Sequence, residues 1–309
     1  MSLRCVVLPL VSVCLVFFVA MEFLLPRASS RQELLEGSSD SSLVLHEKRN
    51  SPLDLEVAGD LAELRFGSVR YIRREDLLKL PHISLMVTDD ANFKSPTPVS
   101  GVVLEALSKR VSADPQSDLI VAICSDQYRA NYPRSYIAAH HPILVLTVNG
   151  KSPDEWSKDP DGLGFSMGPY LISHAKFTPA FKILSHSDEP QIPWGVVRLE
   201  FRNEQKVLGA IVPRGPHARN PEVQNGYHIA EQNCFRCHNI GAEGGTKAGR
   251  PWLVLATWAS AAPDHFTAYV RNPKAKNPRA EMPGNPNYDD ATLNALVAYF
   301  RTFSTHPKP

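Results

Sequence analysis

The clearest periodicity in the chain lies near its end, where apolar residues recur at the spacing of one helical face. They are Leu293, Leu296, Val297 and Phe300, at i, i+3, i+4 and i+7. Asp289 precedes this stripe as an N-cap, and Asp290 falls in the first turn, where the helix dipole favours an acid. We expect this helix to pack on a second one that carries Gly226 and Tyr227, because a glycine permits close approach.

A different pattern fills the chain from about 55 to 212. Short apolar runs at 119–124 and 143–148 predict buried strands. Residues 196–201 alternate between apolar and polar, which is typical of a strand near a sheet edge. Apolar residues at helical spacing between 103 and 111 predict a helix among these strands. The mixture indicates an α+β domain with a mixed sheet over 55–212.

The start of the chain has the composition of a targeting segment. Arg4 precedes an apolar run from Cys5 to Met21, long for a signal peptide and short for a full membrane span. We expect residues 1–26 to be either a cleaved signal peptide or a retained membrane anchor. Both alternatives export the rest of the chain. Residues 27–54, rich in Ser, Glu and Arg, predict a flexible tether.

Length and composition add two limits. A chain of 309 residues suggests two domains with extra segments, and three prolines and a glycine within 213–221 predict the linker between them. The second domain then spans 222–306. The formal net charge of +1 gives no reason to expect a nucleic-acid partner, and 43% hydrophobic residues suffice for real cores.

The five cysteines divide by position. Cys5 and Cys14 belong to the leader, Cys234 and Cys237 lie three residues apart, and Cys124 ends an apolar run. The exported part therefore has no evident disulfide framework. We expect Cys124 to be a small buried hydrophobe rather than a reactive thiol.

The motif Cys234-Phe235-Arg236-Cys237-His238 carries the most chemistry. C-x-x-C-H is the attachment signature of a c-type haem: two thiols on one helical turn add to the haem vinyl groups, and the histidine binds the iron. A zinc site would need a second ligand pair at suitable spacing, and a thioredoxin-like motif should follow a strand. A structural disulfide is the remaining alternative. We expect one covalent haem c.

A sixth iron ligand is available in Met282. It is the one methionine in residues 222–306, and Pro283 and Gly284 after it predict a loop that can place its thioether over the haem. Methionine stabilises ferrous iron and raises the potential. The alternative is a loop methionine that fills a gap in the core.

Four basic residues precede this loop with no acid among them. Two interpretations stay open: a basic rim that steers an acidic redox partner, or a solvated loop. The residues are Arg271, Lys274, Lys276 and Arg279.

The second domain resembles the class I cytochrome c family over most of 222–304. The resemblance implies a small all-α cytochrome c fold with His238 as proximal and Met282 as distal ligand. It also implies that Pro251 supports the haem, since a proline carbonyl of the family accepts a hydrogen bond from the proximal histidine. The residues that carry it are Gly226-Tyr227, Cys234 to His238, 249–253, 269–273, Met282-Pro283 and 298–300.

The first domain resembles the molybdopterin-binding oxidoreductase domain of the sulfite oxidase type over about 60–202. Its motifs lie at 74–81, 98–107, 123–128, 142–150 and 167–171. That family binds molybdenum through a cysteine upstream of its G-V-x-L segment. This chain has no cysteine within 87–93, and Cys124 lies downstream of that segment, so we expect no molybdopterin cofactor.

Two functions follow, and the electron carrier is favoured. The first is an exported c-type cytochrome of the bacterial periplasm, soluble or anchored to the cytoplasmic membrane, that carries single electrons between redox protein partners and has no catalytic residues. The alternative is a molybdopterin-type oxidoreductase that oxidises a small substrate and passes electrons to its fused haem domain. A haem peroxidase is disfavoured, because Met282 would close the iron site.

Overall fold

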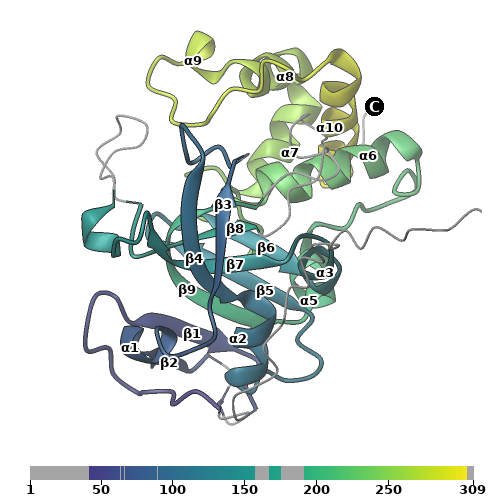
Figure 1. Ribbon diagram of the computed structural model, residues 1–309. Helices are drawn as coiled ribbons and strands as arrows, with labels where there is room; N and C mark the ends of the chain where they lie inside the picture. The colour runs from purple at the N-terminus through teal and green to yellow at the C-terminus, as the bar shows by residue number, and fades with distance from the viewer. Residues whose placement is uncertain are drawn as a thin grey trace, which may run out of the picture. The chain divides into compact units, whose positions relative to one another are not determined.

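The computed structural model describes residues 42–156 apart from Glu63, Phe66 and Asp89, together with residues 167–174 and 191–304 (Figure 1). The predicted leader, residues 1–26, lies outside the described residues. Within the described ranges, no helix combines the length and the apolarity needed to cross a bilayer. All the described residues belong to one compact unit.

Nine strands in the described part form one mixed sheet. Seven of them follow the order β2-β1-β9-β8-β7-β4-β3, and β5 joins through β9 and carries β6 on its other side. β1 and β9 run parallel, whereas the other pairs are antiparallel. The predicted mixed sheet in the N-terminal part is therefore confirmed. The strands are β1 (Leu55–Gly59), β2 (Val69–Ile72), β3 (Ile83–Val87), β4 (Thr97–Val103), β5 (Leu119–Cys124), β6 (Arg129–Pro133), β7 (Pro142–Val148), β8 (Tyr170–His174) and β9 (Trp194–Arg202).

The position of β9 differs from the expectation. Its alternation suggested a strand near a sheet edge, but it pairs with β1, β8 and β5. The polar positions are accommodated inside the sheet by ion pairs: Arg198 pairs with Glu56 and with Glu200, and Arg202 lies 3.2 Å from Glu200. The alternation thus reports a partly buried charged face of an interior strand, on which the charges are paired.

Short helices accompany the sheet. They are α1 (Arg74–Leu77), α2 (Leu104–Arg110), α3 (Arg134–His140), η1 (Pro153–Glu155), α5 (Glu204–Leu208) and η2 (Gly209–Ile211). α2 confirms the helix expected between 103 and 111, with Leu104 and Leu107 buried. The predicted tether ends earlier than residue 54, because the backbone N–H groups of Leu43 and His46 donate to the carbonyls of Arg110 and Tyr71.

The C-terminal part is helical, and Figure 1 shows its helices grouped together. Asn220 caps α6 by accepting from the N–H of Glu222 at 2.9 Å. Asp289 caps α10 as predicted, accepting from the N–H of Thr292 at 2.8 Å. The helices are α6 (Pro221–Ile229), which continues into the π-helical turn η3 (Ala230–Cys234), α7 (Trp252–Ala261), α8 (Pro263–Arg271), α9 (Pro273–Lys276) and α10 (Asp290–Arg301).

The crossing of α6 and α10 is too close to admit a side chain at Gly226. A Cβ atom on Gly226 would lie 2.7 Å from the Cβ of Tyr299 and inside contact distance of the Ala295 carbonyl. The expectation that this glycine permits close approach is therefore confirmed. Trp252 of α7 is fully buried beside this crossing, with its ring 4.9 Å from that of Phe300.

One hydrophobic cluster joins β5 to the helices. Leu119, Val121 and Ile123 of β5 belong to the same buried cluster as Phe235 and the apolar face of α10. The other face of β5 contributes to the core of the sheet, through residues such as Ala122 and Cys124. Cys124 is 2% exposed, which confirms its expected role as a small buried hydrophobe.

Candidate haem site

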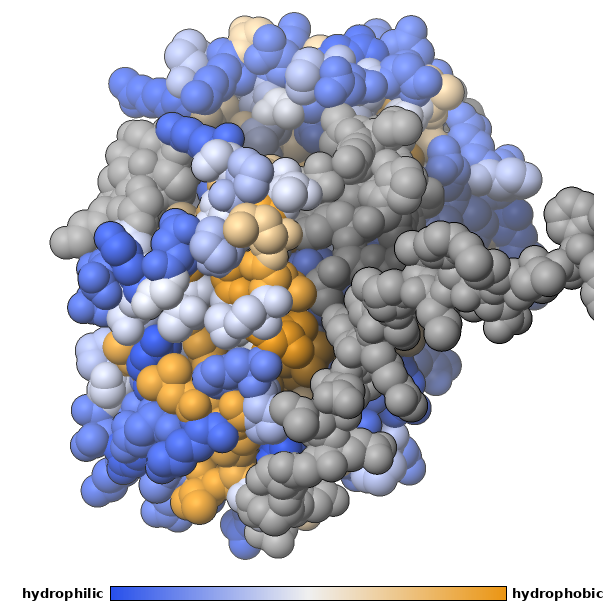
Figure 2. All heavy atoms as spheres, viewed as in Figure 1, coloured by the Kyte–Doolittle hydropathy of each residue, from blue (hydrophilic) through white to orange (hydrophobic). Residues whose placement is uncertain are grey.

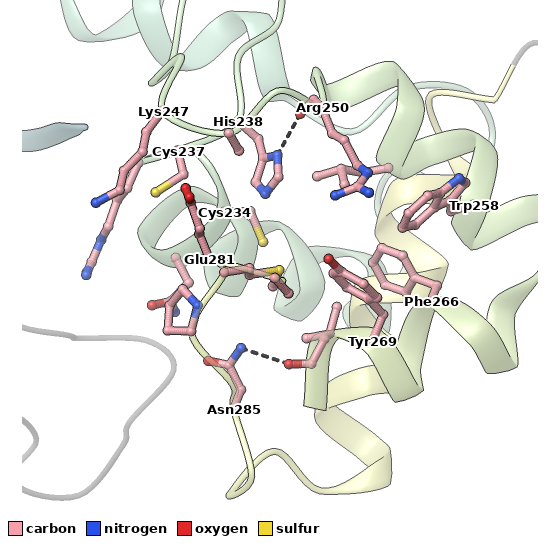
Figure 3. Close-up of a pocket in the computed structure, with 18 of the residues that line it drawn as sticks. Cys234, Cys237, His238, Lys247, Arg250, Trp258, Phe266, Tyr269, Glu281 and Asn285 are labelled. Atoms are coloured by element: carbon pink, nitrogen blue, oxygen red, sulfur yellow. Dashed lines mark hydrogen bonds between the residues drawn. The ribbon is translucent and has the colours of Figure 1, made fainter. Parts of the chain in front are cut away.

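Residues of the C-x-x-C-H motif line a cavity of about 420 Å³ (Figure 3). This volume is in the range of cofactor pockets. Cys234, Cys237, His238 and Met282 all line it. Its walls are mainly apolar and come from α7, α8 and α10: Leu255, Phe266, Val270, Leu296 and Phe300.

The turn that carries the motif presents both thiols to this cavity. The N–H groups of Cys237 and His238 both donate to the carbonyl of Cys234, at 3.1 and 2.9 Å, so the chain winds tightly here. Neither cysteine is in a disulfide, and both are partly buried. Burial raises the pKa of the Cys237 thiol, and the positive charges of Lys247 and Arg236 oppose this. Free thiols on one turn are what attachment to two vinyl groups requires.

His238 is oriented as an iron ligand. Its side chain is almost completely buried, and Nδ1 donates to the carbonyl of Arg250 at 2.6 Å (Figure 3). Nε2 therefore keeps its lone pair for a metal, and a backbone partner on the other ring nitrogen fixes the tautomer and the ring orientation. Burial lowers the pKa of His238, which favours the neutral imidazole that binds iron.

The resemblance to cytochromes c implied that the carbonyl of Pro251 accepts the hydrogen bond of His238. In the structure, the carbonyl one residue earlier accepts it. Arg250 offers the carbonyl, while Pro251 is exposed and forms the N-cap of α7. The guanidinium of Arg250 is held over two rings, 4.9 Å from the centre of Trp258 and 5.6 Å from that of Tyr269. This stacking adds contacts from the segment that receives the His238 bond to α7 and α8.

Met282 lies in the loop between α9 and α10, partly buried against the hydrophobic cluster of the helical part. Asn285 anchors the loop: its side-chain amide donates to the carbonyl of Val270 at 3.0 Å, and its backbone N–H to that of Arg271 at 3.1 Å. Ala280 donates to the carbonyl of Asn277 at 2.9 Å. The thioether is thus held at the cavity by a braced segment.

The four basic residues separate into different environments. Arg271 is paired with Asp290 at 2.6 Å and also donates to the carbonyl of Tyr288, so it braces the loop. Lys274 and Lys276 are exposed on α9, and Arg279 is exposed and lines the cavity. The surface over α8 and α9 is predominantly hydrophilic (Figure 2).

Two further lining residues were not anticipated from the sequence. Tyr128 comes from the turn between β5 and β6, and Lys247 from the glycine-rich loop after the motif. Lys247 forms an ion pair of 2.6 Å with Asp126, which lies in the same β5–β6 turn as Tyr128. No periodicity or spacing in the chain connects residues this far apart.

The segment expected to lack a molybdenum ligand contains a buried carboxyl instead. Asp90 is 3% exposed and accepts from Ser173 Oγ at 2.7 Å and from the N–H of Asn92 at 2.9 Å. Burial raises the pKa of Asp90. Within the described residues, no three metal-binding side chains of the His, Cys, Asp or Glu type gather at one place.

A chemical test of the cavity favours a haem. Two thiols outside any disulfide, a neutral imidazole with an available nitrogen and a thioether line one mainly apolar cavity. These are the groups that attach haem c and bind its iron on both sides, and the apolar walls suit the porphyrin.

Comparison with known proteins agrees for this part of the chain. Residues 221–300 match the family of cytochrome c oxidase, cbb3-type, subunit III. No curated protein matches the chain. A solved structure, the sulfane dehydrogenase SoxCD from Paracoccus pantotrophus, is 12% identical and has a TM-score of 0.31 over 56% of this chain and 45% of its own. That similarity is too distant to indicate an activity, and this chain spans less than half of that one. The C-terminal part of the chain is a cytochrome c domain, and such a domain implies haem c.

Proposed function

We propose that this protein is an exported c-type cytochrome that binds one covalent haem c and carries single electrons between redox protein partners. The main observation that supports this proposal is that one mainly apolar cavity is lined by Cys234, Cys237, His238 and Met282. The match of residues 221–300 to a cytochrome c family supports it.

Haem c supplies reversible one-electron chemistry when it is bound. The residues of this chain determine how that chemistry is used. Cys234 and Cys237 would hold the group covalently, and His238, fixed by the Arg250 carbonyl, would bind the iron through its other ring nitrogen. Met282 would supply a thioether as a second protein ligand. A histidine and a methionine ligand together favour passage of electrons over reaction of a substrate at the metal.

The surroundings keep the site suited to electron exchange. The apolar walls exclude water and raise the cost of the charged ferric state, so they hold the potential up. Lys274, Lys276 and Arg279 are exposed near the Met282 loop and attract an acidic partner. Export follows from the leader at 1–26 and from covalent haem attachment; we place the protein in the bacterial periplasm, soluble or anchored by that leader.

The enzymatic alternative makes a different prediction. In that alternative, residues 55–212 would bind molybdopterin, oxidise a small substrate and reduce the attached haem. We propose instead that residues 55–212 bind no molybdenum, since the segment 87–93 offers no cysteine.

Metal analysis and a redox titration of the purified full-length chain test the proposal. The account predicts about one iron per chain, no molybdenum and reversible one-electron behaviour of the haem bands. Stoichiometric molybdenum would establish the enzymatic alternative. An iron-free chain purified from a host that attaches haem c to a control cytochrome would refute both.

A further inference from the structure

A rigid turn of the sheet part, residues 125–128 between β5 and β6, reaches the haem motif. Internal bonds fix its shape: the N–H of Cys124 donates to the Tyr128 carbonyl at 2.9 Å, and the N–H of Tyr128 donates to Asp126 Oδ1 at 3.0 Å. The strand that carries it, β5, is buried at every position. The turn is therefore a fixed projection and not a loose loop.

Backbone hydrogen bonds join this turn to the motif itself. The N–H of Arg129 donates to the carbonyl of Arg236, which lies between the two cysteines, at 2.9 Å. The N–H of Thr246 donates to the carbonyl of Gln127 at 3.2 Å, and the Arg129 guanidinium donates to the carbonyl of Ala242 at 3.3 Å. The sheet part thus fixes both the motif and the glycine-rich loop that follows it.

Side chains complete the contact at the cavity. Lys247 Nζ lies 2.6 Å from Asp126 Oδ2 and 5.9 Å from the centre of the Tyr128 ring. Burial raises the pKa of Tyr128 to about 12, and the positive charge of the nearby Arg236 opposes this rise. Tyr128, Lys247 and Cys237 line the same cavity, and Figure 3 shows Lys247 on the side of Cys237.

We propose that Tyr128 is a wall of the haem pocket, contacting the haem beside Cys237, and that Asp126 holds Lys247 against the same edge. The sheet domain is then a structural component of the haem site. This inference rests on the proposed function, because it presupposes the haem. It gives residues 55–212 a role in the protein even though they would bind no cofactor of their own.

The physical consequence concerns water. An aromatic ring at the edge of the pocket lowers the local dielectric and limits solvent access, and both raise the potential of a haem. Removing the ring admits water beside Cys237, which stabilises the charged ferric state. A role of Tyr128 in folding alone would not shift the potential in this way.

The test uses the full-length haem-loaded chain. Tyr128→Ala is expected to lower the midpoint potential and to speed reduction by ascorbate, a small reductant. Tyr128→Phe keeps the ring and is expected to restore both values to those of the unmodified chain. Tyr71→Ala, which removes a partly buried ring on β2 that Arg49 covers at 5.5 Å, is the matched control. If Tyr128→Ala and Tyr71→Ala have the same potential, the proposal is wrong.

A second measurement needs no change at Tyr128. Its reactivity toward tetranitromethane, read by peptide mass mapping, is compared between the haem-loaded chain and the haem-free double variant Cys234→Ala, Cys237→Ala. Protection of Tyr128 by haem is expected, with Tyr71 equally reactive in both. Equal reactivity of Tyr128 in the two samples overturns the inference, whereas failure of the unmodified chain to load haem refutes the proposed function.

Discussion

Substitution of Gly226 by alanine tests the packing that frames the haem site. The new Cβ would lie 2.7 Å from the Cβ of Tyr299, whereas ordinary contact begins at 3.4 Å, so this contact alone requires α6 and α10 to separate by about 0.7 Å. The backbone carbonyl of Ala295 lies nearer still and cannot rotate away, so the full separation is larger. A gap of this size removes a quarter to a half of the dispersion attraction between the facing atoms.

The magnitude follows from two opposing effects. Overpacking of this kind costs about 1–3 kcal/mol, and a backbone obstacle places Gly226→Ala near the upper end. The gain in helix propensity from glycine to alanine returns about 1 kcal/mol. The expected net result is a loss of about 2 kcal/mol in the free energy of unfolding, measured by urea denaturation and far-UV circular dichroism.

Gly249→Ala is the matched control. Gly249 lies in the same domain, has no atom within 4 Å of an added Cβ and has no left-handed backbone conformation. Its substitution should change stability by less than about 0.5 kcal/mol. If Gly226→Ala is as stable as Gly249→Ala, the close crossing of α6 and α10 does not exist and the frame described for the cavity is wrong.

Three further predictions concern the ligand, pH and partner docking. Met282→Ala should lower the midpoint potential and abolish the methionine–iron charge-transfer band, because the iron loses a soft ligand. Burial, followed by the charge of Glu204, raises the pKa of Glu231 to about 7 from an ordinary value of 4.5. The folded chain therefore holds a proton between these values that the unfolded chain has lost, so stability falls as pH rises through that window. Glu231→Gln should remove this fall, which at about 1.4 kcal/mol per pKa unit is at most about 3 kcal/mol, measured by urea denaturation at several pH values. The double variant Lys274→Gln, Lys276→Gln should weaken the salt dependence of electron transfer to an acidic redox protein, measured by stopped-flow kinetics.

Each of these has a control in the same chain. Met86 is an exposed methionine on β3, and Met86→Ala should leave the spectrum unchanged. An unchanged spectrum in the Met282 variant would show that Met282 does not bind the iron. Glu222→Gln on the exposed first turn of α6 should keep the pH slope, and the same slope in the Glu231 variant would contradict the assignment. Lys109→Gln on α2, paired with Glu105, should keep the salt dependence.

Local features of the fold could be predicted from the sequence, because they depend on neighbouring residues. The cap at Asp289 and the apolar face of α10 follow from spacings within one helix. The two thiols and His238 share one turn, so their convergence on one cavity follows from the motif alone. Gly226 was expected at a helix crossing because a glycine, which has no Cβ, permits close approach of a second helix.

Contacts between distant segments left no such signal. Which carbonyl accepts the His238 hydrogen bond depends on how the glycine-rich loop folds back. It is the carbonyl of Arg250 and not that of Pro251, as the resemblance had implied. Arg271 is paired within its own domain and is not a free charge of a basic rim. The place of Tyr128 at the cavity depends on the pairing of β5 with β9, and pairing between strands far apart in sequence is not encoded by periodicity.

Covalent attachment of haem is tested most directly by the mass of the purified chain under denaturing conditions. The expected mass is greater than that of the polypeptide by one haem, retained after unfolding because Cys234 and Cys237 would hold the group through thioether bonds. The double variant Cys234→Ala, Cys237→Ala should show the mass of the polypeptide alone. An unmodified chain that carries no haem mass, from a host that loads a control cytochrome c, would contradict the account.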